Sequence, residues 1–291
     1  MNGESGYIEL LRKILEKGEL RQERTGTGTL SLFGEQLRFD LSNERVPLLT
    51  TKFVPYKACI KELLWFLSGC TDVRKLRDQG VHIWDGNSSR EYLDAVGLSD
   101  LPEFDIGAGY GFQWRHFGAE YINCLQEYDG QGVDQIEYVI NEIKTNPTSR
   151  RIFMSAWNPS ALKRMALPPC HVSCQFYVSG DSQLSCHLYQ RSVDCGLGLP
   201  FNIFSYAVLT RVIAMKTGLQ AKELVISTGD THIYTTHVDA LRQQIEREPR
   251  SQPLLRIDDT VVSKDWTQIT IDDFTLSEYN YHPVIKMSMS V

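Results

Sequence analysis

Hydrophobic residues recur with two different periods along this chain, and the periods separate predicted helices from predicted strands. Recurrence at helical spacing predicts helices over 6–17, 55–68, 134–145, 203–217 and 233–246. Alternation, or a short apolar run, predicts strands over 29–41, 151–157, 171–179, 183–191 and 223–228, with 29–41 turned at Gly34. Some strands follow one another directly and others are separated by helices. The pattern therefore predicts an α+β fold, with a single domain over 1–291 built on a mixed β-sheet with flanking helices.

Composition places the chain among soluble globular proteins. Hydrophobic residues make up 42% and charged residues 23% of the 291 residues, and no apolar run is expected to span a membrane. The seven cysteines are odd in number, which argues against a disulfide scaffold and for a reducing, cytoplasmic location, with the nucleus also open. The net charge of −6 disfavours broad electrostatic binding of nucleic acid. A bound anion would have to meet a local arginine cluster.

The motif PPCH over 168–171 carries the most informative chemistry. A cysteine acts as a nucleophile only as its thiolate, which neighbouring guanidinium groups favour. The later segment YQRSVD over 189–194 supplies an arginine, hydroxyl and carboxylate. This combination indicates covalent chemistry on a small phosphorylated heterocycle, although Cys170 could also be an inert core residue. A zinc site is disfavoured, because strand alternation separates the candidate ligands Cys170, His171, Cys174, Cys186 and His187.

Several polar side chains have both a structural and a functional interpretation. Asn202 could cap a helix, or its amide could donate to O4 and accept from N3–H of a uracil ring. Glu62 shares a predicted helix with large apolar residues, so it is either a surface carboxylate or an acid with a raised pKa. His232 and Tyr234 lie on one face of an extended segment, where they either join the core or bind a sugar hydroxyl.

Blocks of sequence in a fixed order resemble the thymidylate synthase family over nearly the whole chain. They include RTGTGTLSLFG (24–34), ELLWFLSG (62–69), YGFQWRHFGAEY (110–121), RRIFMSAWNP (150–159), LPPCH (167–171), YQRSVDCGLGLPFNIFSYAVLT (189–210) and GDTHIY (229–234). The resemblance implies a methyltransferase that converts deoxyuridylate (dUMP) to thymidylate. It implies 5,10-methylenetetrahydrofolate as the donor of both the carbon and the hydride, and no metal. It also implies a homodimer that packs through a sheet face.

The resemblance also implies roles for individual residues. The implied catalytic residues are Cys170, Glu62, Tyr110, Asn202, Arg191 and His171, with Cys170 adding to C6 of uracil. The implied dUMP ligands are Arg24, Arg150, Arg151, Gln190, Arg191, Ser192, Val193, Asp194, Asn202, His232 and Tyr234, with Arg150 and Arg151 reaching the partner subunit's site. The implied folate contacts are Lys52, Ile83, Trp84, Asn87, Asp194, Leu197, Gly198, Phe201, Ser290 and Val291.

Alternatives remain open at this point. A deoxycytidylate hydroxymethylase would share the fold and the cysteine, but Asn202 in place of aspartate argues against it. RNA binding as a secondary role finds no support in the acidic pI of about 5.7. Phe53 stands where the family usually has arginine, which leaves contacts to the glutamate tail of folate open. Strand alternation would direct Arg191 and Ser192 to opposite faces, so either a β-bulge redirects one of them or one assigned role is wrong.

Overall fold

The computed structural model describes residues 3–22 and 26–289. The α-helices are α1 (Gly3–Lys17), α2 (Tyr56–Leu67), α3 (Arg74–Arg77), α4 (Asp85–Ser88), α5 (Arg90–Ala95), α6 (Tyr110–His116), α7 (Gln135–Thr145), α8 (Gly198–Thr217) and α9 (Val238–Ile245). The strands are β1 (Glu19–Arg21), β2 (Thr29–Asp40), β3 (Phe153–Ser155), β4 (His171–Val178), β5 (Gln183–Asp194), β6 (Gln220–Tyr234), β7 (Leu254–Ile257) and β8 (Phe274–Ser277). Short 3-10 helices are η1 (Leu162–Arg164), η2 (Thr235–His237), η3 (Asp259–Val262), η4 (Trp266–Gln268) and η5 (Ile271–Asp273).

A mixed β-sheet forms the centre of the molecule. Among the described residues, its strand order is β1-β2-β6-β5-β4-β3, and β7 pairs with β8 in a separate hairpin. The β5 and β6 strands are parallel, whereas the other neighbouring pairs are antiparallel. The parallel pair requires a crossover, which α8 supplies. The predicted α+β fold with one domain on a mixed sheet is therefore confirmed.

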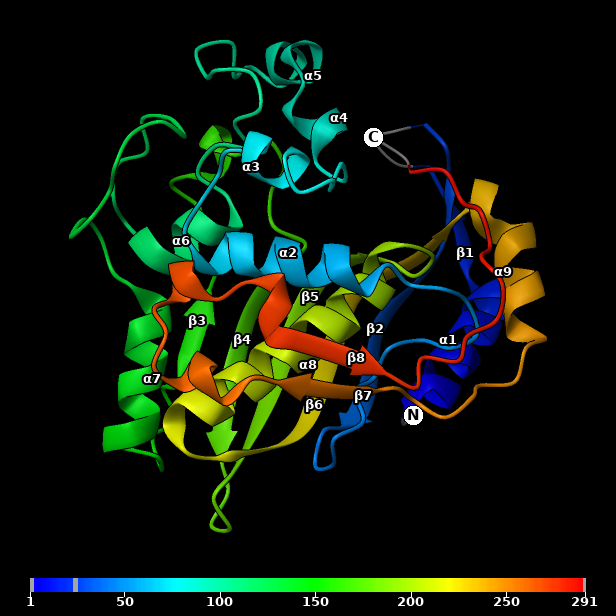
Figure 1. The fold of residues 1–291 in the computed structure, drawn as a ribbon. Coiled ribbons are helices and arrows are strands. Elements are labelled where there is room, and N and C mark those ends of the chain that lie inside the picture. Colours follow the sequence, from blue (N-terminus) through cyan, green and yellow to red (C-terminus); the bar gives the residue numbers. More distant parts are fainter. Residues whose placement is uncertain (1–2, 23–25, 290–291) are drawn as a thin grey trace.

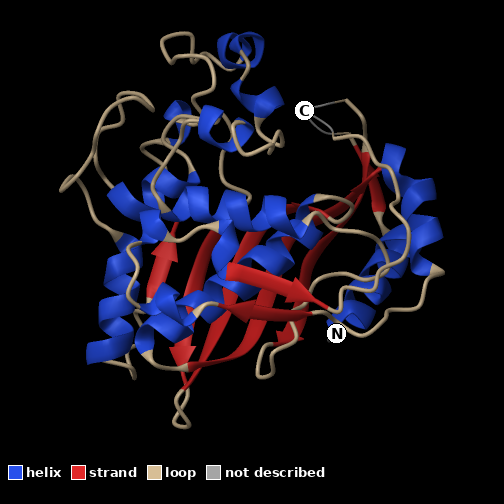
Figure 2. Ribbon diagram, in the orientation of Figure 1, coloured by secondary structure: helices blue, strands red, loops and turns tan. Residues whose placement is uncertain are grey.

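Helices cover one face of this sheet in layers. Helix α8 packs on β5 and β6, and α2 packs on α8. Figures 1 and 2 show α2, α8 and the β7–β8 hairpin on the same side of the sheet, with α1 and α9 beside its β1–β2 end. Because α8 contacts the sheet on one side and other helices on another, most of its side chains are buried.

The opposite face of the sheet exposes aromatic side chains. Phe153, Tyr177 and Tyr189 are 45%, 67% and 41% exposed. The register places Phe153 opposite Gln175, and Gln175 opposite His187, so these residues share a face across β3, β4 and β5. Exposed aromatic residues gathered on a sheet face are typical of a surface that another protein covers.

Several predicted elements have different bounds in the structure, and the largest differences have a physical reason. Segment 29–41 is one strand, because Gly34 adopts a left-handed φ of 80° without interrupting the register with β6. Helix α8 begins at Gly198 instead of 203, because Pro200 is tolerated in a first turn. Strand β6 continues to Tyr234, which leaves only Val238–Ile245 for the helix predicted over 233–246.

The length of α8 also corrects the expectation that no apolar run is long enough to span a membrane. Within the described residues, α8 is the one helix with the length and hydropathy to cross a membrane, and 78% of its apolar window is buried inside the protein. Burial against β5 and β6 accounts for this hydropathy, since a helix apolar on all sides is typical of a core.

Candidate active site

Cys170 lies directly before β4, where contacts from two other segments hold its main chain. Its backbone N–H donates to the Tyr110 hydroxyl at 2.8 Å. Its main-chain carbonyl accepts from the main-chain N–H of Arg191 at 3.0 Å. The thiol itself is partly buried. The start of β4, the end of β5 and the start of α6 therefore meet at this cysteine.

The Arg191 guanidinium is fixed against the loop that leads to Cys170. Its Nε and Nη2 each donate at 2.8 Å, to the carbonyls of Pro169 and Pro168. Its Cζ atom also lies 5.4 Å from the centre of the Trp157 ring. The guanidinium is therefore a fixed cation on the loop that leads to Cys170, and a cation near a cysteine is the setting in which reactive thiols are found.

Arg191 and Ser192 remain directed to opposite faces. Pairing between β5 and β6 keeps one register from Gln190 to Ser192, so no β-bulge redirects either residue there. The register shift lies in β4, between His171 and Ser173. Arg191 approaches Cys170 through its bonds to the proline carbonyls. A joint role of Arg191 and Ser192 in phosphate binding stays a prediction.

His171 is a neutral member of an aromatic stack. Its ring lies 4.1 Å from that of Tyr110, and Tyr110 lies 4.9 Å from Phe66. Burial lowers the pKa of His171 to about 3, and its Nδ1 lies 2.9 Å from the Tyr206 hydroxyl. A neutral imidazole adds no positive charge beside Cys170. Arg191 is therefore the cation that the described residues place there.

Glu62 faces the same region from α2. Its Oε1 accepts from Trp84 Nε1 at 2.7 Å, and Trp84 itself is 8% exposed. Burial raises the pKa of Glu62 to about 7, although the bond from Trp84 opposes the shift. A carboxyl group that exchanges its proton near neutral pH suits general acid–base chemistry.

We expect Glu62→Gln to change how stability depends on pH. In the unfolded chain Glu62 is ionised at both pH 6 and pH 8, whereas in the native state it loses its proton as pH rises through about 7. The unfolding free energy of the wild-type protein should therefore fall by about 1 kcal/mol between pH 6 and pH 8. The variant, which has no ionisable group at position 62, should not show this decrease. Urea unfolding at both pH values measures the difference, with the exposed Glu103→Gln as the control. Parallel pH profiles for wild type and Glu62→Gln would contradict the raised pKa.

Asn202 lies within α8 and does not cap it, because that helix begins at Gly198. Its Oδ1 accepts from Gln190 Nε2 at 2.7 Å, and Gln190 is fully buried. This bond fixes which end of the Asn202 amide is the acceptor. The Nδ2 group remains a donor, and Oδ1 retains a second lone pair.

Asp194 ends β5 and caps the turn into α8. Its two carboxylate oxygens accept from the N–H groups of Gly196 and Leu197, at 2.8 and 3.1 Å. Burial alone would raise the pKa of Asp194, but interactions with His237 and the Gly196 N–H outweigh it and lower the pKa. Burial lowers the pKa of the neighbouring Lys52 to about 8 although Asp194 opposes the shift, and the Lys52 ammonium donates to the Gly196 carbonyl.

His232 and Tyr234 lie side by side at the end of β6, as predicted. Their ring centres are 5.3 Å apart, and His232 Nδ1 lies 2.9 Å from Asp230 Oδ1. Parallel pairing sets Asp194 opposite His232. The ends of β5 and β6 thus bring these side chains to the same edge of the sheet. Val193 is buried on β5 beside them.

The remaining predicted folate contacts that the structure describes come from two segments. Ile83 and Trp84 precede α4, which contains Asn87, and Leu197 precedes α8, whose first turns contain Gly198 and Phe201. These residues are partly buried except for Trp84. Phe53, which stands where the family usually has arginine, packs among aromatic rings. Its ring centre lies 4.9 Å from that of Tyr281 and 6.2 Å from that of Tyr279. Arg24, Ser290 and Val291 lie outside the described residues.

Arg150 and Arg151 are predicted site residues that lie far from the Cys170 of the same chain. Both are exposed in the loop before β3. Ser155 pairs with Ser173 near Cys170, but Phe153 pairs with Gln175, so the strand leads away from the cysteine toward the arginines. At about 3.3 Å per residue, Arg151 lies roughly 20 Å along β4 from Cys170.

Sequence reasoning missed three residues that shape the site. Tyr206 bonds to His171, Trp157 packs beside the Arg191 guanidinium, and His237 lies 3.8 Å from Asp194. Tyr206 follows Asn202 by four residues on α8, so helical spacing could have found it. The other two contacts join distant segments and leave no local signal.

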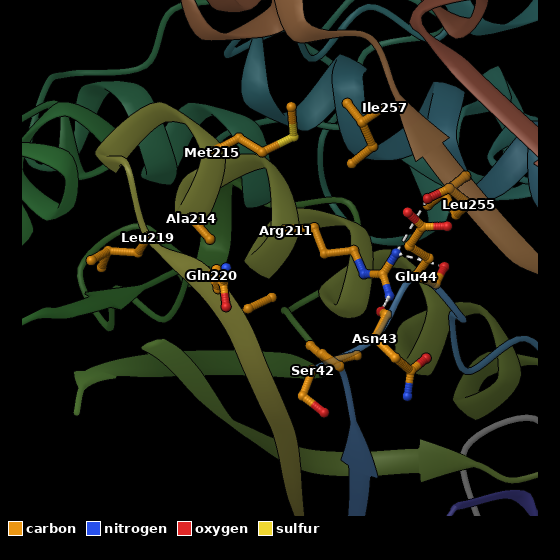
Figure 3. Close-up of a pocket in the computed structure, with 12 residues that line it drawn as sticks. Ser42, Asn43, Glu44, Arg211, Ala214, Met215, Leu219, Gln220, Leu255 and Ile257 are labelled. Carbon is orange, nitrogen blue, oxygen red and sulfur yellow. Dashed lines mark hydrogen bonds between the residues drawn. The ribbon is translucent and has the colours of Figure 1, made fainter. Parts of the chain in front are cut away.

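A separate pocket of about 350 Å³ lies away from these residues, against α8 and β7. Arg211 forms part of its wall, and Figure 3 shows the guanidinium directed at main-chain oxygens near Asn43 and Glu44. Burial lowers the pKa of Arg211, which also donates to the carbonyls of Arg45 and Leu255. These bonds attach the 43–45 loop and β7 to α8, which is a structural role.

A partly buried cysteine next to an arginine, with an acid of pKa about 7 in the same region, is an arrangement that suits an enzyme using covalent catalysis. The chain belongs to the thymidylate synthase family, whose model matches residues 5–291. A thymidylate synthase of Saccharomyces cerevisiae is 54% identical over 99% of this chain and 97% of that relative. The thymidylate synthase of Homo sapiens is 53% identical over 100% of this chain and 91% of the relative. The bifunctional dihydrofolate reductase-thymidylate synthase of Leishmania major is 53% identical, and the chain spans 55% of it.

Proposed function

We propose that the chain catalyses the reductive methylation of dUMP to thymidylate. The Cys170 thiolate adds to C6 of the uracil ring, which makes C5 nucleophilic. The observation that carries the proposal is the joint position of Cys170 and Arg191, in a chain that matches this family from residue 5 to residue 291. Methylenetetrahydrofolate supplies the one-carbon unit and the hydride and leaves as dihydrofolate.

The polar groups of the site have distinct tasks in this reaction. Asn202, oriented by Gln190, donates to uracil O4 and accepts from N3–H, a pattern that cytosine cannot match. Donors placed at O4 also stabilise the negative charge that develops there after thiolate addition. Glu62 exchanges protons near O4, since its pKa of about 7 permits both protonation states. His232 and Tyr234 bind the sugar hydroxyl.

The residues proposed to hold the folate suit a flat heterocycle with hydrogen-bond donors. Trp84 and Phe201 provide apolar surface, and Asp194, whose pKa is lowered, provides an ionised acceptor at the end of β5. The glutamate tail is proposed to lie elsewhere than on residue 53, because Phe53 packs with Tyr279 and Tyr281.

We also propose that two copies pack through the exposed sheet face. Phe153, Tyr177 and Tyr189 provide the apolar part of this face. Arg150 and Arg151, exposed and distant from their own Cys170, would then donate to the phosphate bound by the partner subunit. The odd number of cysteines, seven, supports a cytoplasmic location, because it argues against a disulfide scaffold. RNA binding stays a secondary proposal, which the net charge of −6 does not favour.

A mechanism-based inhibitor tests the proposed reaction directly. With methylenetetrahydrofolate and 5-fluoro-dUMP, a covalent complex should accumulate on Cys170, because fluorine replaces the C5 hydrogen and cannot be removed as a proton in the next step. Mass spectrometry of peptides should locate the adduct on this residue. Excess dUMP should prevent its formation, and excess deoxycytidylate should not. Absence of an adduct, or faster turnover of deoxycytidylate than of dUMP, would overturn the proposed function.

A further inference from the structure

The side chain of His237 is enclosed where three distant segments meet. It is fully buried at the end of η2, directly after β6. Its Nε2 lies 2.7 Å from the main-chain carbonyl oxygen of Ser288, in the C-terminal segment. Its Nδ1 lies 3.8 Å from Asp194 Oδ1, at the end of β5. One imidazole ring therefore spans the gap between the C-terminal segment and Asp194.

The bond to Ser288 fixes the tautomer of the ring. A carbonyl oxygen only accepts hydrogen bonds, so Nε2 must carry a proton. The second nitrogen, Nδ1, is buried and has no hydrogen-bond partner among the described residues. It faces a carboxylate, so the next proton to bind His237 adds beside Asp194. The protonated ring attracts Asp194 and the Ser288 carbonyl at the same time.

The charges around His237 favour this protonated form. Burial alone would lower the pKa of His237, but Asp194 and the Ser288 carbonyl outweigh it and raise the pKa. Lys52, which donates to the Gly196 carbonyl, opposes the shift as the neighbouring cation. The Tyr234 ring lies 5.6 Å away and adds no charge.

Gly196 allows the three segments to approach so closely. A Cβ atom at this position would lie 2.9 Å from His237 Nδ1, 3.2 Å from Asp194 Oδ1 and 3.2 Å from the Met287 sulfur. The side chains of β5, η2 and the C-terminal segment thus occupy the space that a larger residue would need. Any substitution here should separate the C-terminal segment from Asp194.

We propose that His237 is a positioning residue that fastens the C-terminal segment to Asp194 across the folate site. The inference rests on the proposed function, because it assigns Asp194 to folate binding. Fastening depends on the proton at Nδ1, so it weakens as pH rises through the pKa of His237. His237 touches neither of the reacting carbons. It acts by holding the Ser288 main chain and the Asp194 carboxylate in one arrangement.

Kinetics of His237→Gln separate this role from a general structural one. A glutamine can still donate to Ser288 but carries no charge to attract Asp194. We expect the KM for methylenetetrahydrofolate to rise about tenfold, and the KM for dUMP to stay within about twofold of the wild-type value. In the wild type the folate KM should increase as pH rises from 6 to 9, and His237→Gln should lack this increase. His116→Gln, a partly buried histidine elsewhere, should behave as the wild type.

Protease protection provides a readout that does not require turnover. In the complex with 5-fluoro-dUMP and methylenetetrahydrofolate, a carboxypeptidase should release the C-terminal residues slowly from the wild type and several times faster from His237→Gln. Gly196→Ala adds a Cβ atom between His237, Asp194 and the C-terminal segment, so this variant should also lose protection. It provides a second test if His237→Gln does not fold.

The outcomes distinguish this inference from the proposed function. No adduct on wild-type Cys170 would overturn the proposed function. If adducts form but both variants keep wild-type protection, His237 does not fasten the C-terminal segment. Equal rises in both KM values, with an unchanged pH profile, would also overturn the inference.

Discussion

Cys170→Ser is expected to lower turnover by about 10⁴-fold or more while leaving the fold intact. A serine hydroxyl remains almost fully protonated at neutral pH, so Arg191 has no anion to stabilise at this position. The substitution is nearly isosteric and the thiol is only partly buried, so thermal unfolding should be unchanged. Steady-state assays with dUMP and methylenetetrahydrofolate measure the loss. Peptide mass spectrometry with 5-fluoro-dUMP should detect no adduct on residue 170.

Cys124→Ser is the matched control for this variant. Cys124 is also partly buried and also lies near an arginine, with its sulfur 3.9 Å from Arg74 Nη2. Burial, together with Asp105 and Asp72, raises the pKa of Cys124 to about 12, so it is an unreactive thiol. Its replacement should leave turnover unchanged. Activity of Cys170→Ser above about 1% of the wild-type value would refute covalent catalysis by Cys170.

Much of the fold could be predicted because local patterns determine it. Helices α2 and α7 agree with the predictions within a residue or two, since Pro55 and Asp134 mark their starts. Gly34 misled the prediction for a physical reason. A glycine with positive φ is typical of a turn, yet here the partner strand β6 continues past it in the same register. Such pairing depends on residues almost 200 positions away.

The candidate site shows the same division between local and distant information. His232 and Tyr234 lie on the same face of β6 because side chains alternate along a strand, and this alternation can be read from the sequence. The bond between Gln190 and Asn202 joins β5 to α8, and the contact of His237 with Ser288 joins η2 to the C-terminal segment. Tertiary packing alone sets these contacts. The interpretation of Asn202 as a helix cap failed because Gly198 and Pro200, which usually favour a turn, begin the helix here.

The position of Arg150 and Arg151 suits a role in the site of a second copy of the chain. Both arginines are exposed and lie roughly 20 Å along β4 from their own Cys170. Two copies related by a two-fold axis would bring each pair to the other copy, because an isologous interface exchanges equivalent surfaces. A residue that serves the partner's site can be complemented by a partner that retains it, whereas a residue that serves its own site cannot.

We therefore expect two inactive variants to restore activity when they are mixed. The first variant is Cys170→Ser, and the second carries Arg150→Ala and Arg151→Ala. After dissociation and random reassociation, about half of the dimers are mixed, and each mixed dimer contains one intact site, so activity should recover to about one quarter of the wild-type value. Mixing Cys170→Ser with Arg191→Ala is the control, because both residues belong to the same chain's site and no mixed dimer is intact. Recovery in the control, or none in the test pair, would contradict the shared site.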